Sequence, residues 1–179
     1  MRIISGKSRG TKLFSPEGED TRPTLDRVRE AIFSMIAEVI PASKVLDLFA
    51  GSGAMGLEAL SRGADMADFV DISSAACSVI AKNIDKTHLD GGRIHNCSFE
   101  VFLKRCSDKY DLIFLDPPYS AGYYRTALDA VKEYKLLADG GMIVAECSSE
   151  TELDCMGFEI FRMRKYGKVN VYILTEGEI

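Results

Sequence analysis

The chain has 179 residues, of which 46% are hydrophobic and 27% are charged, and this is the composition of one ordinary globular domain. No uncharged apolar run approaches the roughly 20 residues that cross a bilayer, so the sequence excludes an integral membrane protein. The net charge of −5 at pH 7 argues against a nucleic-acid partner for the chain as a whole, unless its basic side chains gather in one place.

Two elements are predicted before the first strand. Residues 1–23 are rich in glycine, proline and charge, a composition that predicts a short hairpin or arm rather than a packed layer. From Thr24, a good N-cap residue, apolar side chains recur every three or four positions up to Ile40, and Pro41 ends the pattern. We therefore expect a helix over residues 24–40.

Short apolar strands and helical segments alternate along the rest of the chain. Strands are predicted over residues 44–49, 67–71, 93–97, 111–115 and 141–146, and helices over residues 54–62, 73–86, 99–106 and 124–135. This alternation predicts a parallel sheet with helices on both faces, whereas the strand-like runs 157–163 and 169–174 predict an antiparallel pair. The predicted fold is α/β: a doubly wound, Rossmann-like sheet of seven strands with an antiparallel C-terminal hairpin and a short N-terminal hairpin or arm.

Basic side chains gather near both ends of the chain. The first 29 residues carry seven basic and four acidic side chains, and the last 23 carry four and three. The two basic clusters are Arg2, Lys7, Arg9 and Lys12 at one end and Arg162, Arg164, Lys165 and Lys168 at the other. If both ends share a face, they form a local positive patch that phosphates can use; otherwise they are solvated surface charges.

The five cysteines are odd in number, form no Cys-x-x-Cys pair and are accompanied by only two histidines. Neither a disulfide framework nor a zinc site has its usual spacing, so we expect reduced, mostly buried thiols and no metal. The first seven residues lack the apolar core of a secretory signal, and a cytoplasmic location is expected.

Ligands of doubly wound sheets bind beyond the carboxyl ends of the parallel strands. Residues 51–56 read Gly-Ser-Gly-Ala-Met-Gly and match the dinucleotide-binding fingerprint, and Asp71 follows Gly51 by twenty residues, as a ribose-binding acid does. Four of the five predicted parallel strands end at an acid, and the third ends at Ser98; the acids are Asp47, Asp71, Asp116 and Glu146.

Asp47 decides which ligand this glycine-rich turn suits. It lies four residues before Gly51, where its carboxylate can reach the ligand, and a pyrophosphate 4 Å away would be repelled by about 4 kcal/mol at an effective dielectric of 20. S-adenosylmethionine carries a sulfonium and an ammonium but no phosphate, and its ribose still needs an acid such as Asp71. Gly51 and Gly53 would then allow close approach of the backbone to the ligand. A glycine-rich turn without a ligand is the alternative.

Residues 116–119, Asp-Pro-Pro-Tyr, follow the fourth strand. The exocyclic amine of a base is a poor nucleophile because its lone pair is delocalised into the ring. Asp116 and the carbonyl of Pro117 can accept the amino hydrogens and direct the lone pair toward an electrophilic methyl group, while Pro117 and Pro118 keep these acceptors stiff. Tyr119 offers a flat face for a base turned out of its stack. A proline-stiffened turn is the alternative.

Together these motifs resemble a class I S-adenosylmethionine-dependent methyltransferase of the amino-group type. Over nearly the whole chain the sequence is similar to the RsmD family of 16S rRNA guanine-N2 methyltransferases. The segments that carry this similarity are residues 2–7, 9–10, 22–33, 45–53, 56–64, 114–119 and 166–167.

The resemblance implies S-adenosylmethionine as cofactor and a guanine amino group of 16S rRNA, in the small ribosomal subunit, as substrate. It implies an RNA-facing arm over residues 1–23 and a methyltransferase domain over residues 24–179, acting as a monomer without metal or membrane. The implied cofactor-binding residues are Asp47, Phe49, Gly51, Gly53, Asp71, Ile72, Ser98 and Phe99. The implied catalytic residues are Asp116, Pro117, Pro118 and Tyr119. The residues expected to contact RNA are Arg2, Lys7, Arg9, Lys12, Arg22, Thr24 and Tyr166.

Three alternative functions stay open at this point. An adenine-N6 methyltransferase of DNA or RNA also uses Asp-Pro-Pro-Tyr, although such DNA enzymes usually carry an added recognition domain for which 179 residues leave little room. An oxidoreductase using a nicotinamide cofactor would use the same glycine fingerprint. A non-catalytic RNA-binding module could have kept the fold.

Overall fold

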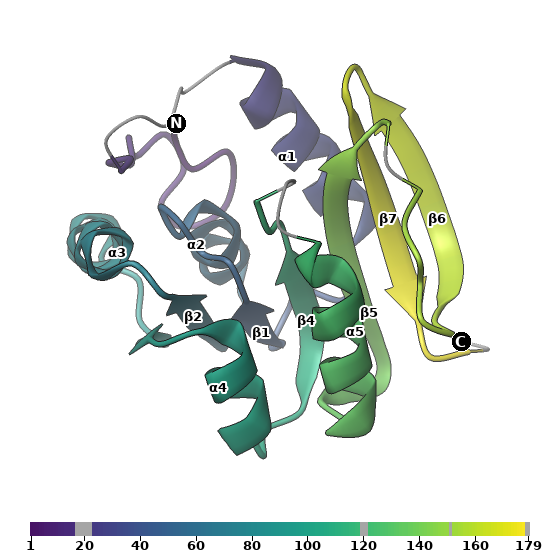
Figure 1. Cartoon of the computed structure of the whole chain (residues 1–179). Helices are drawn as coiled ribbons and strands as arrows, with labels where there is room; N and C mark the ends of the chain where they lie inside the picture. The colour runs from purple at the N-terminus through teal and green to yellow at the C-terminus, as the bar shows by residue number, and fades with distance from the viewer. Residues whose placement is uncertain (17–22, 119–121, 151, 178–179) are drawn as a thin grey trace.

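The structure is a computed structural model that describes residues 1–16, 23–118, 122–150 and 152–177. Its strands are β1 (Lys44–Asp47), β2 (Met66–Asp71), β3 (Gly92–Asn96), β4 (Tyr110–Leu115), β5 (Leu137–Ser148), β6 (Glu159–Tyr166) and β7 (Val169–Thr175). They form one sheet in the order β3-β2-β1-β4-β5-β7-β6 (Figure 1). Strands β1 to β5 are parallel, and β7 runs antiparallel between β5 and β6. The predicted doubly wound sheet with its C-terminal hairpin is confirmed.

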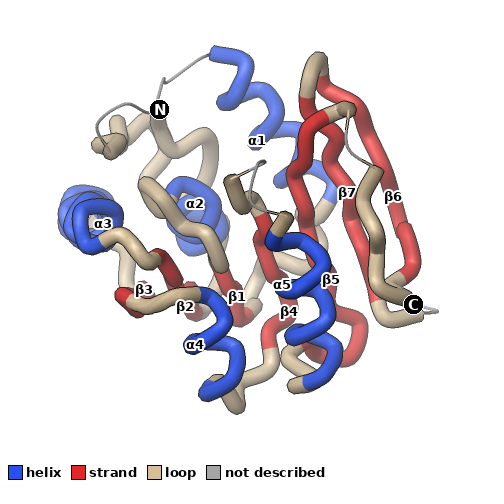
Figure 2. The backbone as a smooth tube through the Cα atoms, in the orientation of Figure 1, coloured by secondary structure: helices blue, strands red, loops and turns tan. Residues whose placement is uncertain are grey.

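Two layers of helices cover the sheet. The helices are α1 (Pro23–Met35), α2 (Ala54–Ser61), α3 (Ser74–Thr87), α4 (Phe99–Arg105) and α5 (Tyr123–Glu133). Because successive side chains of a strand point to opposite faces, Phe114 of β4 enters the core that α1 and α2 share, while Leu115 enters the core under α4 and α5. Figure 2 shows α4 and α5 together on one side of the strands.

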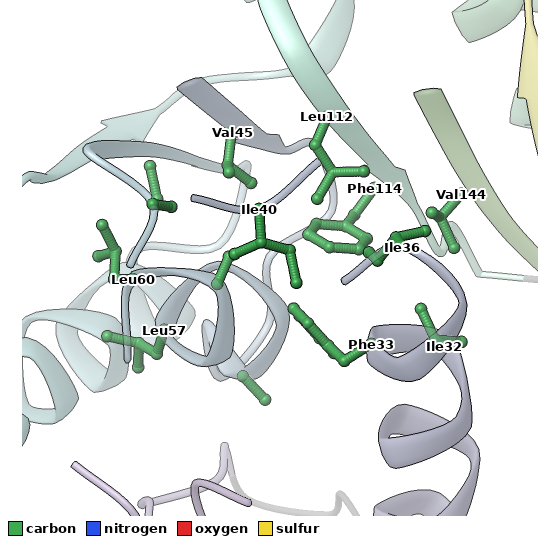
Figure 3. Close-up of a cluster of buried hydrophobic side chains, with 14 of the residues drawn as sticks. Ile32, Phe33, Ile36, Ile40, Val45, Leu57, Leu60, Leu112, Phe114 and Val144 are labelled. Carbon is green, nitrogen blue, oxygen red and sulfur yellow. The ribbon is translucent and has the colours of Figure 1, made fainter. Parts of the chain in front are cut away.

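The core under α1 fixes this helix against the middle of the sheet. Figure 3 shows Phe33 beside Phe114 of β4, with ring centroids 5.6 Å apart, and Ile36 near Val144 of β5. Phe33 and Ile36 are at most 1% exposed. Arg29 lies one helical turn before Phe33, so the same packing holds Arg29 near the carboxyl ends of β4 and β5.

The N-terminal residues form the expected hairpin, but it packs against the rest of the domain. A single antiparallel bridge joins Arg2 to Lys12, and the N–H of Ile3 donates to the carbonyl of Thr11 at 3.0 Å. Ile3 is 1% exposed and belongs to the core of α1 and α2, as does Leu13. The hairpin is therefore present as predicted, and the burial of Ile3 and Leu13 in the core adds a contact that its composition did not indicate.

The first helix ends earlier than expected. It stops at Met35, and the N–H of Val39 donates to the carbonyl of Ile36 at 3.0 Å in a tighter turn. Ile36 and Ile40 still reach the core, so the apolar spacing continues where the helix does not. None of the described helices is long and apolar enough to span a membrane.

Candidate active site

The carboxylate of Asp71 helps to hold the loop after β1 to the end of β2, together with a backbone hydrogen bond from the N–H of Ala50 to the carbonyl of Val70 at 3.0 Å. Gly53, in the left-handed conformation with φ of 76°, precedes α2 and turns the chain away from the sheet edge. Asp71 accepts the N–H of Gly51 through Oδ2 at 2.8 Å and the N–H of Ser73 through Oδ1 at 2.8 Å. This arrangement fixes the glycine turn at the carboxyl edge of the sheet, where ligands of such folds bind.

A cavity of about 840 Å³, here called the larger cavity, opens at this edge. Its described lining residues are Leu48, Phe49, Gly51, Asp71, Ile72, Cys97, Ser98, Phe99, Glu100, Asp116, Pro117, Pro118 and Tyr123. None of these residues is basic, and three are acids. The larger cavity therefore suits a positively charged organic ligand better than a phosphate.

Apolar surfaces make one wall of the larger cavity. The rings of Phe49 and Phe99 lie 5.1 Å apart, and Tyr123 lies 5.2 Å from Phe99 and nearly parallel to Phe49 at 6.1 Å. Ile72 is 76% exposed although it lines the cavity. An exposed isoleucine beside aromatic rings is a surface on which a flat heterocycle can pack.

A second cavity of about 300 Å³, here called the smaller cavity, lies beside the larger one. The two share Phe49, Gly51 and Asp116 in their linings. The smaller cavity is also lined by Asp47, Glu146 and Arg29, among others. Asp116 therefore lies where both cavities meet, which is the position that a group acting between two bound molecules requires.

Two acids of the smaller cavity, Asp47 and Glu146, have pKa values well above those of free carboxyl groups. Asp47 is 4% exposed and accepts the N–H of Gly56 at 3.0 Å. Burial raises the pKa of Asp47 to about 7, the hydrogen bond from Gly56 opposes this rise, and the charges of Asp116 and Asp71 add to it. Burial and the charge of Asp116 raise the pKa of Glu146 to about 8. Clusters of buried acids with raised pKa values are typical of functional sites.

The structure brings most of the predicted cofactor residues together. Phe49, Gly51, Asp71, Ile72, Ser98 and Phe99 all line the larger cavity with Asp116, Pro117 and Pro118. Asp47 lies instead at the wall of the smaller cavity. Gly53 is absent from both described linings; a side chain there would press on Ile80 and Phe69 at 3.3 Å. The Ser98 hydroxyl caps α4 by accepting the N–H of Val101 at 3.4 Å.

The described residues that were predicted to contact RNA lie on the N-terminal hairpin and at the end of β6. Arg2, Lys7, Arg9 and Lys12 are all exposed on the N-terminal hairpin. The hairpin runs back along α2, because the N–H of Lys7 donates to the carbonyl of Ser61, at the C-terminal end of that helix, at 2.7 Å. Figure 1 shows α1 between this hairpin and the β6–β7 turn. Tyr166 is half-buried at the end of β6, against the core. Arg22 and Tyr119 lie outside the described residues, as does the side chain of Thr24.

Three residues of the site were not predicted from the sequence. Tyr123 lines the larger cavity, and Glu146 and Arg29 line the smaller one. Glu146 was visible as an acid at a strand end. Arg29 could have been noticed as the one charge on the apolar stripe of the first helix, four residues before Phe33.

Comparison with known proteins assigns the fold and the family. A family model described as "Conserved hypothetical protein 95" matches residues 1–175. The solved structure of Escherichia coli yhhF matches with a TM-score of 0.86 at 34% identity, covering 97% of this chain and 96% of that one. The more distant structure of SMU.776, complexed with SAH, is 17% identical with a TM-score of 0.71, covering 86% of this chain and 50% of that one. At that identity it shows the fold alone.

A curated relative gives the same assignment. Ribosomal RNA small subunit methyltransferase D of Escherichia coli K12 is 37% identical over 153 residues, which are 86% of this chain and 77% of that protein. The similarity noted from the motifs thus extends over most of the chain. On these matches, the chain belongs to the RsmD family of methyltransferases.

Proposed function

We propose that this protein transfers a methyl group from S-adenosylmethionine to the exocyclic N2 amino group of a guanine in 16S rRNA of the small ribosomal subunit. The observation that carries the proposal is the position of Asp116, which lines both the acid-rich larger cavity and the smaller one. The name of the Escherichia coli relative, a small-subunit rRNA methyltransferase, supports the choice of substrate. A ribosomal substrate in turn agrees with a cytoplasmic location.

The residues of the larger cavity fit the proposed cofactor. Ile72 and Phe99 offer apolar surface for an adenine, and Ser98 lies beside them at the start of α4. Asp71 keeps lone pairs beyond its two backbone hydrogen bonds and can accept from ribose hydroxyls. The acids and the absence of basic residues among the described lining residues favour a cation over the pyrophosphate of a dinucleotide. When bound, S-adenosylmethionine supplies an electrophilic methyl group on a positively charged sulfur.

Asp116 and the two prolines after it would prepare the acceptor. The Asp116 carboxylate and the Pro117 carbonyl accept the hydrogens of the guanine amino group and aim its lone pair at the shared mouth of the two cavities. The amine becomes positive as its new bond forms, and the Asp116 charge stabilises it. Pro117 is buried and its ring fixes φ, which restrains the backbone at this corner. Catalysis here is positioning together with electrostatic support.

The edge around the cavities would hold the RNA. We assign residues 1–23 as an RNA-facing arm on a methyltransferase domain of residues 24–179, acting as a monomer. Arg2 and Arg9 line a cavity of about 430 Å³ with Arg27, Asp26 and Glu30 of α1, so three basic side chains face two acids there, and the exposed arginines suit phosphates. Lys7, Lys12, Arg22, Thr24 and Tyr166 complete the proposed RNA surface, and Tyr119 is proposed to stack on the target base.

The test is methyl transfer onto small subunits that lack the modification. Purified protein, radiolabelled S-adenosylmethionine and small subunits from a strain without the gene are combined, and the RNA is digested to nucleosides. We expect label in N2-methylguanosine, in a single nucleotide when the RNA is mapped by mass. Label in N6-methyladenosine, or none, would overturn the proposal. Thermal stabilisation by S-adenosylhomocysteine and not by NAD separates a methyltransferase from an oxidoreductase.

A further inference from the structure

An exposed aromatic ring follows the N-terminal hairpin. Leu13 is 8% exposed and belongs to the core, whereas its neighbours Lys12 and Phe14 are exposed, Phe14 by 48%. Because successive residues of an extended segment point to opposite sides, Lys12 and Phe14 share the outer side. A cation and a flat ring are thus presented to solvent together.

The backbone of Phe14 is fixed by one buried side chain of α3. Asn83 is fully buried; its Oδ1 accepts the N–H of Phe14 at 2.8 Å, and its Nδ2 donates to the carbonyl of Phe14 at 3.0 Å. The same Nδ2 donates to the carbonyl of Ser52 at 2.9 Å. Ser52 lies in the glycine turn, next to Gly51 of the larger cavity. The side chain of Asn83 therefore holds Phe14 in a defined place beside the turn that borders the larger cavity.

A wide hollow of about 810 Å³ lies beside this ring. Its described lining residues are Phe14, Ser15, Val79, Lys82, Asp85 and Lys86. The Nζ of Lys86 lies 4.2 Å from the centroid of the Phe14 ring. Among the residues that the structure describes, no carboxylate forms an ion pair with Lys82 or Lys86. The hollow thus combines a flat apolar ring with two ammonium groups, against the single carboxylate of Asp85.

Proteins that bind single-stranded nucleic acid combine the same two components, because aromatic rings stack on bases while cations follow the phosphates. We infer that Phe14 stacks on a base of the ribosomal RNA other than the reacting guanine, with Lys82 and Lys86 on the neighbouring phosphates. This inference rests on the proposed function and adds to it a second base-binding place, apart from Asp116. An acidic segment of a ribosomal protein would also meet the two lysines, and the test separates the two partners.

The chain contains no tryptophan, so Phe14→Trp gives the protein a single indole whose fluorescence reports on this site alone. Two single-stranded probes are titrated at low salt: a hexamer of adenosine nucleotides, and a hexamer of equal charge whose sugars carry no bases. We expect the adenosine hexamer to quench the fluorescence at least about twofold and the abasic one to leave it unchanged, because only a base stacks. Tyr134→Trp, at the end of α5, is the matched control and should not be quenched.

The two lysines are tested by the salt dependence of binding to the adenosine hexamer. Exchanging Lys82 and Lys86 together for glutamine should make the slope of log affinity against log salt shallower by about 1.4, the share of two phosphate contacts on a single strand. Glutamine at the exposed residues Lys104 and Lys135 is the control and should leave the slope unchanged.

Methyl transfer onto small subunits that lack the modification measures what the ring contributes to the reaction. Phe14→Leu keeps an apolar side chain but loses the flat face, so kcat/KM should fall about tenfold, the share of one stacked base. The loss should appear in KM, with kcat within about twofold of the wild type, because Phe14 does not touch the reacting atoms. Phe14→Tyr and Tyr134→Leu should keep the wild-type values, and all variants should bind S-adenosylhomocysteine within about threefold of the wild type.

Three results would overturn the inference while leaving the proposed function intact. The first is equal quenching of Phe14→Trp by the two hexamers, or quenching by neither. The second is wild-type kcat/KM in Phe14→Leu. The third is a lower kcat/KM in Phe14→Leu without base-dependent quenching, which would give Phe14 to a ribosomal protein. If the wild type methylates no small subunit, the proposed function fails, and the fluorescence titration still decides whether the ring stacks on a base.

Discussion

Asp71 and Gly51 are joined by a hydrogen bond of 2.8 Å that ties the end of β2 to the glycine turn after β1. The other carboxylate oxygen of Asp71 accepts the N–H of Ser73 at the start of α3. One side chain therefore shapes three segments around the larger cavity. Its loss should alter the cavity even before any direct contact with a ligand is considered.

Asp71→Asn should weaken S-adenosylhomocysteine binding by about tenfold, because the amide nitrogen cannot accept one of the two backbone N–H groups. Asp71→Ala should weaken it further. Isothermal titration calorimetry measures both affinities, with the exposed Asp90→Asn as control. Unchanged affinity in Asp71→Ala would remove Asp71 from the cofactor site.

Glu58 anchors the N-terminal hairpin. It is fully buried on α2 and accepts the N–H of Ile4 at 2.7 Å, the N–H of Ser5 at 3.0 Å and the Nε of Arg62 at 2.7 Å. Glu58→Ala leaves these donors unpaired and should lower the free energy of unfolding by about 3 kcal/mol. Urea unfolding measures the loss, and limited proteolysis should then cut the hairpin. The exposed Glu30→Ala on α1 is the control, and a hairpin that stays protected in Glu58→Ala would contradict the anchor.

Asp116→Ala should separate catalysis from cofactor binding. Without the carboxylate the amine is neither aimed nor stabilised, so single-turnover transfer should fall by about 10³-fold, while S-adenosylhomocysteine affinity stays within about threefold. The exposed Asp129→Ala on α5 should behave as the wild type. If Asp116→Ala keeps the wild-type turnover, Asp116 does not orient the amine.

Asp47 makes stability depend on pH. Its pKa is about 7 in the folded protein against 3.8 for the free side chain, so the folded state holds the proton more tightly than the unfolded state between these values. The contribution of Asp47 to the free energy of unfolding therefore falls as pH rises from 4 to 7. Asp47→Asn keeps an acceptor for the Gly56 N–H without the charge, so it should gain stability relative to the wild type from pH 5 to pH 8.

Urea unfolding at both pH values tests this dependence. Glu146 titrates with the same sign, so the informative quantity is the difference between Asp47→Asn and the wild type rather than either curve alone. The same difference at pH 5 and pH 8 would show that Asp47 does not carry the raised pKa.

The basic hairpin should govern the salt dependence of RNA binding. Exchanging Arg2, Lys7, Arg9 and Lys12 together for glutamine should make the slope of log affinity against log salt shallower by about 2 to 3, the share of three or four phosphate contacts. Filter binding to small-subunit RNA at several salt concentrations measures the slope. Glutamine at the exposed basic residues Lys104, Arg105, Lys109 and Lys135 is the matched control. A slope unchanged from the wild type would show that these four charges are solvated surface charges that do not contact phosphates.

Local sequence patterns were enough to predict the sheet and the position of the larger cavity. The apolar run up to Leu115 predicted a strand buried on both faces, and the acids after it predicted where chemistry could occur. Asp71 and Asp116 could be placed because parallel strands end at one edge, and the structure puts both in the lining of the larger cavity. These features depend on short-range periodicity and on strand direction, which a sequence displays directly.

Features set by distant contacts could not be predicted in the same way. The helical pattern places Arg29 on the apolar stripe, but it gives no sign that the carbonyl of Arg2 in the hairpin accepts a hydrogen bond from its guanidinium. The packing of Ile3 depends likewise on α2, which follows fifty residues later. The roles of Tyr119 and Arg22 remain predictions, because both residues lie outside the described part of the chain.

A crystal structure of the protein with S-adenosylhomocysteine tests the central claim most directly. We expect the adenine beside Ile72 and Phe99 and the ribose at Asp71. We expect the sulfur between the two cavities, facing Asp116. A ligand whose sulfur lies away from Asp116 would contradict it.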